Sequence, residues 1–275
     1  MAILSSPSET SSLSGKTAIV TGGSRGIGRA IAIHFARKGI TNLAITYVSN
    51  KAAAEYTLEQ TRTLGVKQAI AIQADATDPT LAPRLIKEVL SGLNTTTIDI
   101  LVNNAVLTDI SKTSDVSKLA VEAFSETMIA NVFSPVTLTT AFMEHAPKYG
   151  GRVINISSVA SKTGNSNPII TYGASKAALD SFTRSFAETF SSDRSITFNS
   201  VAVGPTETDA LAAARATIPE IIDKQKDYST AAPRLGEPED VAYIVGFLAS
   251  EEGRWVNGAA VSANGGHRQT LALFG

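Results

Sequence analysis

The chain has 275 residues, and its 24 Lys plus Arg nearly balance its 25 Asp plus Glu, which gives a formal net charge of -1. No basic run stands out, and this argues against a nucleic acid or a membrane surface as a partner. The absence of cysteine excludes disulfides, thiolate catalysis and cysteine-ligated metals. The three histidines, His34, His145 and His267, lack the spacing of metal ligands, so we expect structural or surface roles and no metal site.

The N-terminal residues 1–14 are rich in serine and have neither a basic start nor a long apolar run, so they do not resemble a signal peptide. We expect them to form a flexible segment. No apolar stretch approaches the roughly 20 residues that a membrane helix needs. No linker, repeat or low-complexity segment divides residues 15–275. We therefore expect a cytoplasmic protein with one catalytic domain over 15–275.

Short apolar runs alternate with helical patterns along this domain. The predicted strands are 17–20, 43–47, 68–73, 98–102, 152–156, 196–203 and 259–262. The predicted helices are 27–39, 51–64, 80–93, 118–145, 170–190, 209–228 as one or two helices, and 238–250. Strand–helix alternation with short connections is typical of right-handed βαβ units. The pattern predicts a doubly wound parallel α/β sheet of about seven strands, with helices on both faces.

A glycine-rich turn, Thr21-Gly22-Gly23-Ser24-Arg25-Gly26-Ile27-Gly28, separates the first strand from the first helix. The free N–H groups at a helix N-terminus suit a pyrophosphate, and glycines let the backbone approach it. The spacing is G-x-x-x-G-x-G, not the G-x-G-x-x-G of the commonest dinucleotide motif. An ordinary βα loop can look the same, but the strand–turn–helix context favours a dinucleotide site.

Tyr172 and Lys176 lie four positions apart in a predicted helix and therefore on one face of it. A phenol keeps its proton until about pH 10, and a neighbouring ammonium lowers that pKa toward neutrality. Such a pair also arises by chance on surface helices, where it is only solvated. Ser158, at the end of a predicted strand, has no partners for a nucleophilic triad, so we expect it to hydrogen-bond a carbonyl oxygen. Ser157 is the rival for that role.

In combination, these motifs resemble those of the short-chain dehydrogenase/reductase family over about residues 15–266. The residues that carry the resemblance are Thr21 to Gly28, Asn103-Asn104-Ala105, Ser158 and Tyr172 to Lys176, together with Ala74-Asp75, Gly236 to Val241 and Asn264-Gly265-Gly266. The resemblance implies a Rossmann-like fold and reduction of a carbonyl by a reduced nicotinamide, with Tyr172 as the proton donor. It also implies that Lys176 bonds the nicotinamide ribose and that Asn131 supports a water between Lys176 and solvent.

The resemblance implies the cofactor contacts as well. Asp75 would bond the adenine amino group, Asn104 and Ala105 would flank the cofactor, and Thr206 and Thr208 would reach the nicotinamide amide. The expected cofactor-binding set is Gly22, Ser24, Arg25, Gly26, Ile27, Gly28, Ser49, Asn50, Asp75, Ala76, Asn104, Ala105, Tyr172, Lys176, Gly204, Thr206 and Thr208.

NADP(H) is favoured over NAD(H) because residues 46–51, after the second strand, contain no carboxylate to hold a ribose 2′-hydroxyl or to repel a 2′-phosphate. Arg25, with Ser49 and Asn50, can bind that phosphate. For Lys51, binding of the phosphate and simple exposure at the start of a helix are equally good interpretations. Two positions depart from the family pattern: Val106 replaces a glycine, and Pro205 is displaced by two positions.

Residues 206–234 are expected to form much of a substrate lid. Leu211, Ile218, Ile221 and Ile222 can line a pocket or simply pack on the domain. No arginine cluster indicates a phosphorylated substrate, so we expect a neutral, hydrophobic or aromatic ketone, or the corresponding alcohol. The alternatives are enone reduction or a non-redox step on the same scaffold, or a cofactor-sensing protein without turnover. The family likeness also implies a homo-oligomer, tetramer or dimer, in which the tail Leu271-Ala272-Leu273-Phe274 can dock.

Overall fold

The computed structural model describes residues 9–108, 111–217 and 219–273. Seven strands form one sheet in the order β3-β2-β1-β4-β5-β6-β7. Their bounds are β1 (Thr17–Val20), β2 (Asn42–Tyr47), β3 (Gln68–Gln73), β4 (Ile100–Asn103), β5 (Arg152–Ser158), β6 (Thr197–Val203) and β7 (Ala260–Ala263). Every neighbouring pair is parallel. The predicted doubly wound parallel sheet in a single domain is confirmed.

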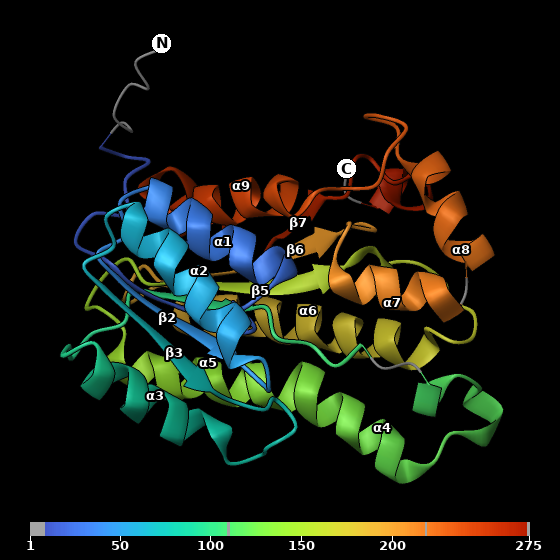
Figure 1. The fold of residues 1–275 in the computed structure, drawn as a ribbon, viewed down its shortest axis with the longest axis horizontal. Helices are drawn as coiled ribbons and strands as arrows, with labels where there is room; N and C mark the ends of the chain where they lie inside the picture. The colour runs from blue at the N-terminus through green and yellow to red at the C-terminus, as the bar shows by residue number, and fades with distance from the viewer. Residues whose placement is uncertain (1–8, 109–110, 218, 274–275) are drawn as a thin grey trace.

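Helices cover both faces of the sheet (Figure 1). Their bounds are α1 (Gly26–Arg37), α2 (Lys51–Thr63), α3 (Leu81–Gly92), α4 (Val121–Met128), α5 (Ser134–His145), α6 (Ile170–Phe190), α7 (Asp209–Thr217), α8 (Pro219–Lys224) and α9 (Pro238–Ala249). Neighbouring residues of a strand face opposite ways, so the sheet has two cores. Ala18 and Val20 pack with α1, α2 and α9, while Ile19 packs with α3, α5 and α6.

The packed domain begins no later than Leu13 rather than at residue 15. The Leu13 side chain is 1% exposed and belongs to the core beneath α1, and its N–H donates to the carbonyl of Lys38 at 2.8 Å. A single buried leucine in a serine-rich segment gives no periodic signal, so the sequence pattern indicates a domain start only at residue 15. Residues 1–8 of the predicted flexible segment lie outside the described residues. No helix in the described part of the chain is long and apolar enough to cross a membrane.

The helical region predicted over 118–145 is divided into three parts. α4 and α5 are separated by one π-helical turn, Ile129–Phe133, and the first helical residue is Val121. π turns are rare and occur mostly as single insertions, often at functional sites. This turn contains Asn131, whose side chain bonds the backbone of Leu107 instead of facing solvent. Hydrophobic spacing alone cannot show such an insertion. The prediction of one or two helices over 209–228 is confirmed by α7 and α8.

Helices α1 and α9 pack closely through His34. Its ring lies edge-on to Tyr243, with ring centroids 5.2 Å apart. Gly246 leaves space for the imidazole, because a Cβ at this position would collide with Nε2 of His34. Burial, with a smaller effect from Lys38 and Arg37, lowers the pKa of His34 from 6.5 to about 4. His34 is therefore a neutral packing residue, consistent with the structural role expected for it.

This packing predicts a loss of stability in mild acid. The folded-state pKa of His34, about 4, lies below its unfolded value of 6.5, so the unfolded chain takes up the proton first as the pH falls. Stability should fall between pH 6.5 and 4, by about 1–3 kcal/mol for this partly buried group. The check is urea unfolding of the wild type and His34→Gln across this range. His34→Gln should show a shallower pH dependence, and parallel curves would contradict the assignment.

Candidate active site

The glycine-rich turn lies between β1 and α1, at the carboxyl edge of the sheet. Gly22 and Gly26 have φ values of +64° and +52°, in the left-handed region that favours glycine. Gly28 is needed for space, because a Cβ there would collide with the carbonyl oxygen of Gly22 and the amide of Asn104. The N-cap of α1, Arg25, makes no side-chain capping hydrogen bond. The turn therefore presents bare backbone and uncapped N–H groups, the requirements of a pyrophosphate site.

Thr21 connects this turn to the loop that follows β4. Its Oγ1 accepts hydrogen bonds from the N–H groups of Asn104 and Ala105, each at 2.9 Å, and lies 3.3 Å from the carbonyl of Val102. The Asn104 amide donates back to the Thr21 carbonyl at 2.8 Å. Thr21 therefore fixes the position of two residues of the predicted cofactor set. It was not itself predicted as a site residue, although it opens the motif.

The two arginines beside the turn have different environments. Arg29 donates to the carbonyl of Ser24 through Nε at 3.1 Å and Nη2 at 2.6 Å, and its guanidinium lies over the Tyr56 ring at 5.4 Å. Arg29 is therefore committed to holding the turn against α2. Arg25 is exposed and forms no ion pair within the described residues. Of these two cations, Arg25 is the one available to an external anion.

The remaining residues that are predicted to bind the adenosine part of the cofactor follow β2 and β3, which are neighbours in the sheet. Ser49 and Asn50 are exposed, and Oδ1 of Asn50 accepts the N–H of Ala53 at 2.9 Å as the N-cap of α2. Oδ1 of Asp75 accepts both the N–H and the hydroxyl of Thr77, at 2.9 and 2.8 Å. These bonds orient the side chains and leave the other Asn50 and Asp75 side-chain atoms for a ligand. Ala76 and Ala105 both line a small cavity of about 10 Å³ nearby.

Ser158, Tyr172 and Lys176 meet in a cavity of about 320 Å³. Ser158 is the last residue of β5, and the other two lie on α6. The Ser158 side chain lies beside the phenol of Tyr172 and lowers its pKa, and the Ser158 hydroxyl accepts the N–H of Ala160 at 3.2 Å. The rival, Ser157, also lines the cavity, but its buried Oγ has no hydrogen-bond partner in the part of the chain that the structure describes. The geometry favours Ser158.

Burial dominates the electrostatics of this site. It raises the pKa of Tyr172, and the hydrogen bond from Ser158 only partly opposes this effect. Burial also lowers the pKa of Lys176 to about 8, against the attraction of Asp180. The Lys176 ammonium donates to the carbonyl of Ile156 at 2.8 Å and lies 5.8 Å from the Tyr172 ring centroid. The expected low pKa of Tyr172 is therefore not found here, because burial raises this pKa and the opposing effect comes from Ser158 rather than from Lys176.

Asn131 is bonded to Ser175 on α6, the helix that carries Tyr172 and Lys176. Its Oδ1 accepts the N–H of Leu107 at 2.8 Å, and its Nδ2 donates to the carbonyl of Leu107 and the hydroxyl of Ser175, both at 3.2 Å. Ser175 immediately precedes Lys176. Asn131 therefore holds the loop after β4 against α6. Its predicted support of a water remains a prediction.

The loop after β6 closes the other side of the cavity. The hydroxyl of Thr206 donates to the carbonyl of Gly204 at 2.9 Å, and the hydroxyl of Thr208 donates to the backbone carbonyl of Thr206 at 3.3 Å. The Thr208 methyl also lies beside Gly26, where an added Cβ would be 3.3 Å away. The loop therefore approaches the glycine-rich turn directly.

Helices α7 and α8 lie at the edge of the sheet toward which β5 points (Figure 1). Leu211 and Ile222, from the predicted lid, line the cavity, and so do Ile27 and Val106. Ile218 lies outside the described residues, as does the side chain of Ile221. Helices α7 and α8 thus supply part of the cavity wall, as expected of a lid.

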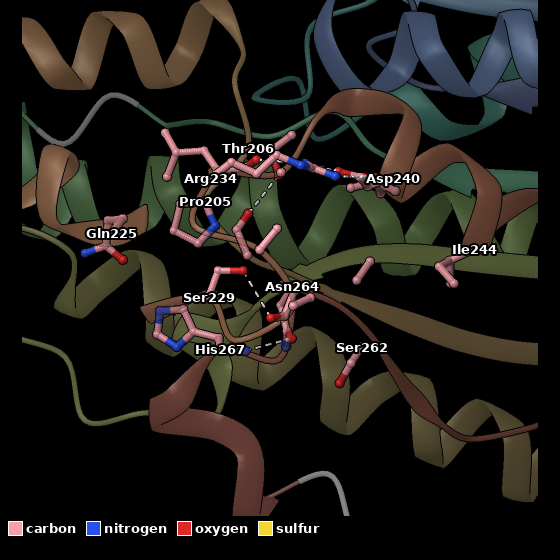
Figure 2. Close-up of a pocket in the computed structure, with 18 residues that line it drawn as sticks. Pro205, Thr206, Gln225, Ser229, Arg234, Asp240, Ile244, Ser262, Asn264 and His267 are labelled. Atoms are coloured by element: carbon pink, nitrogen blue, oxygen red, sulfur yellow. Dashed lines mark hydrogen bonds and ion pairs between the residues drawn. The ribbon is translucent and has the colours of Figure 1, made fainter. Parts of the chain in front are cut away.

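A second cavity, of about 240 Å³, shares Gly204, Pro205, Thr206 and Gln225 with the first. Figure 2 shows Ser229 and His267 on one side of it and the Arg234–Asp240 ion pair on the opposite side. His267 is 3% exposed and stacks on Tyr228 with centroids 5.3 Å apart. Neither ring nitrogen has a hydrogen-bond partner within the described residues. A lone histidine in a loop gives no sequence signal for this burial.

Comparison with known proteins agrees with this geometry. A family model described as "Enoyl-(Acyl carrier protein) reductase" matches residues 22–268. The short chain dehydrogenase penD of Penicillium thymicola is 60% identical over 261 residues, which cover 94% of this chain and 94% of that protein. A short chain dehydrogenase from Burkholderia cenocepacia J2315 in complex with NADP matches with a TM-score of 0.82 and 32% identity, covering 92% of this chain and 98% of that one. The angucycline C-6 ketoreductase LanV with bound NADP has a TM-score of 0.82 and 35% identity, covering 93% and 96%.

The parallel sheet, with a glycine-rich turn and a cavity at its carboxyl edge, defines a dinucleotide-binding domain. Within that class, the matches over nearly the whole length show that the chain belongs to the short-chain dehydrogenase/reductase family.

The role of Thr21 predicts that Thr21→Val destabilises the protein and weakens NADPH binding. Valine has a similar shape but no hydroxyl, so the N–H groups of Asn104 and Ala105 lose their acceptor. The expected cost is about 2–3 kcal/mol of unfolding free energy. Thr21→Ser keeps the hydroxyl and is the matched control. Urea unfolding and NADPH fluorescence titration check both effects, and a valine variant that behaves like the serine variant would contradict the role.

Proposed function

We propose that the chain is an NADP(H)-dependent oxidoreductase that reduces the ketone of a neutral, hydrophobic or aromatic small molecule to an alcohol, or catalyses the reverse reaction. The observation that carries this proposal is the meeting of Ser158, Tyr172 and Lys176 in one cavity that also reaches Asn104 and Thr206. A binding protein without turnover would not need a serine and a tyrosine in one cavity with a buried lysine.

The residues present fit a dinucleotide along the whole edge of the sheet. The bare turn at Gly22 and Gly26 suits the pyrophosphate, and Arg25 is free to meet a 2′-phosphate. The remaining expected contacts are Ser24, Ile27, Gly28, Ser49, Asn50, Asp75, Ala76, Asn104, Ala105, Gly204, Thr206 and Thr208. The NADP in two similar structures and the missing carboxylate at residues 46–51 both support NADP(H) over NAD(H).

When bound, the reduced nicotinamide supplies the hydride that reaches the carbonyl carbon. The Ser158 hydroxyl donates a hydrogen bond to the carbonyl oxygen as negative charge develops on it. Tyr172, which lines the same cavity as Ser158, gives its proton to that oxygen. The phenolate that remains is stabilised by Lys176, whose pKa of about 8 leaves most of its amines charged at neutral pH. In the reverse direction, the Tyr172 phenolate takes the proton from the alcohol and becomes the phenol again.

The walls of the cavity support a neutral substrate. Apolar side chains dominate them: Ile27, Val106, Val159, Ile169, Leu211 and Ile222. Lys176 is the one charged side chain among the described residues that line the cavity, and it is already bonded to the carbonyl of Ile156. A phosphate or carboxylate on the substrate would therefore find no cation placed to bind it.

Enone reduction is the second candidate, favoured by the description of the matching family model as an enoyl reductase. Product analysis separates the two reactions, because an enone reductase saturates the C=C bond and leaves the ketone intact. A cofactor-sensing protein would bind NADPH and oxidise none of it with any carbonyl compound.

We also propose a homo-oligomer, dimer or tetramer. Large apolar side chains remain exposed on α6 and α9, at Phe182, Phe190 and Tyr243, and Trp255 is 95% exposed. Exposed aromatic residues of this number favour a protein contact. In the predicted docking tail, Leu271 is 55% exposed; Phe274 lies outside the described residues.

The reaction assignment predicts that Tyr172→Phe binds NADPH normally but loses at least about a thousand-fold in turnover, since the proton donor is gone. Ser158→Ala should lose about a hundred- to thousand-fold in kcat. The matched control is Ser157→Ala, which should keep most activity. The measurements are NADPH fluorescence for binding and NADPH absorbance loss with a panel of aromatic ketones. Full activity of Tyr172→Phe would reject the mechanism.

The cofactor assignment predicts that Arg25→Gln weakens NADPH binding about ten- to a hundred-fold and leaves NADH binding almost unchanged. Only NADPH carries the 2′-phosphate that the guanidinium would contact. Arg25→Lys keeps the charge and should recover part of the affinity. Fluorescence titration with both nucleotides gives the ratio of dissociation constants. An equal loss for the two nucleotides would show that Arg25 does not discriminate between them.

A further inference from the structure

A buried carboxylate, Asp180, lies one helical turn after Lys176 on α6 and is 2% exposed. Tyr172, Lys176 and Asp180 are spaced by four residues each and so follow one side of the helix. Oδ2 of Asp180 accepts a hydrogen bond from the Ser161 hydroxyl at 2.7 Å and pairs with the Lys162 ammonium at 3.3 Å. Its Oδ1 is buried and has no hydrogen-bond partner among the described residues.

Both partners of this carboxylate belong to the segment that follows Ser158. Residues Val159–Ser161 form a single 3-10 turn directly after β5. The Ser161 hydroxyl also lies 2.8 Å from the Ser158 carbonyl. A hydroxyl has one proton, and a carboxylate is the stronger acceptor. The contacts therefore run from α6 through Asp180 and Ser161 to the backbone of Ser158.

The charge of Asp180 also acts on Lys176. Lys176 is 3% exposed, and the described groups that face it are the carbonyl of Ile156 from β5 and the phenol of Tyr172 and carboxylate of Asp180 from α6. Lys162, with a side chain that is 23% exposed, reaches Asp180 from the other side and offsets part of its charge. Asp180 is the neighbour that raises the pKa of Lys176 against the effect of burial.

Stability alone is a weak explanation for this arrangement. A buried ion pair usually stabilises a fold no better than apolar residues of the same volume, because both charges lose their hydration. An unpartnered carboxylate oxygen adds a further cost. A buried carboxylate is thus poorly suited as a packing residue. Its interactions instead reach the segment after Ser158, through Ser161, and Lys176 on α6.

We propose that Asp180 is a positioning residue for the reaction: its carboxylate joins the segment after Ser158 to the helix that carries Tyr172 and Lys176, and it places a fixed negative charge beside Lys176. The expected effect of Asp180 on turnover rests on the proposed function. The electrostatic influence of Asp180 on Lys176 can be tested without turnover.

The first test is a titration of Lys176 by NMR in protein labelled with [13C]lysine, with Lys176→Met used to assign its signal. Asp180→Asn keeps the shape and the acceptor for Ser161 but removes the charge, so the midpoint of Lys176 should move to lower pH. Lys162→Met is the matched control, for which a shift in the opposite direction is expected. It leaves the charge of Asp180 unopposed, so the midpoint of Lys176 should move to higher pH. It also provides the test if Asp180→Asn does not fold. An unchanged midpoint in the folded variants would overturn the proposal.

The second test is the pH profile of kcat with any ketone from the panel that the wild type reduces. In Asp180→Asn the alkaline limb should move to lower pH, with a loss of roughly five-fold at pH 8 for a one-unit shift. Ser161→Ala should lower kcat without moving that limb, because it breaks the link to Ser158 and keeps the charge. If all profiles coincide, the positioning role is rejected. If the NMR midpoint moves but the wild type reduces no ketone, the proposed function fails and the influence of Asp180 on Lys176 stands.

Discussion

Parallel pairing of the seven strands is the constraint on which the site depends. Because every neighbouring pair runs the same way, the loops after β1 to β6 all emerge at one edge of the sheet. The registers bring these ends together: Val20 pairs with Val102, and Ser158 with Val203. The glycine-rich turn and the serine of the catalytic set are far apart in sequence but are adjacent at this edge for that reason.

Local contacts then determine how precisely the loops meet. The Thr21 hydroxyl holds the backbone after β4, and Arg29 holds the carbonyl of Ser24. Asn131, on its π turn, fastens the same loop after β4 to the helix of Lys176. Most of the hydrogen bonds of these side chains go to backbone atoms. Arg25, which is proposed to touch the ligand, forms no ion pair within the described residues.

The strands and most helices could be predicted because apolar spacing reports burial directly, as in the run Thr17 to Val20. The candidate catalytic residues could be named because the chain resembles a known family and because each follows a predicted strand or shares a helical face. What could not be predicted depends on contacts between distant segments. Leu13 is an isolated apolar residue whose burial comes from packing beneath α1. The π turn at Asn131 has no periodic signature, and the carboxylate of Asp180 shows its importance only once Ser161 and Lys162 are folded against it.

The electrostatic prediction at Tyr172 failed for a related reason. From sequence, the phenol and the amine four residues away are a pair in which the cation dominates. In the folded protein Lys176 is buried and Tyr172 is half-buried, and burial opposes charge on each of them. The chain must therefore provide other groups to keep Lys176 charged, namely the carbonyl of Ile156 and the carboxylate of Asp180. The proposed proton donor, Tyr172, needs a charged lysine beside it, and the cost of burying Asp180 is consistent with that need.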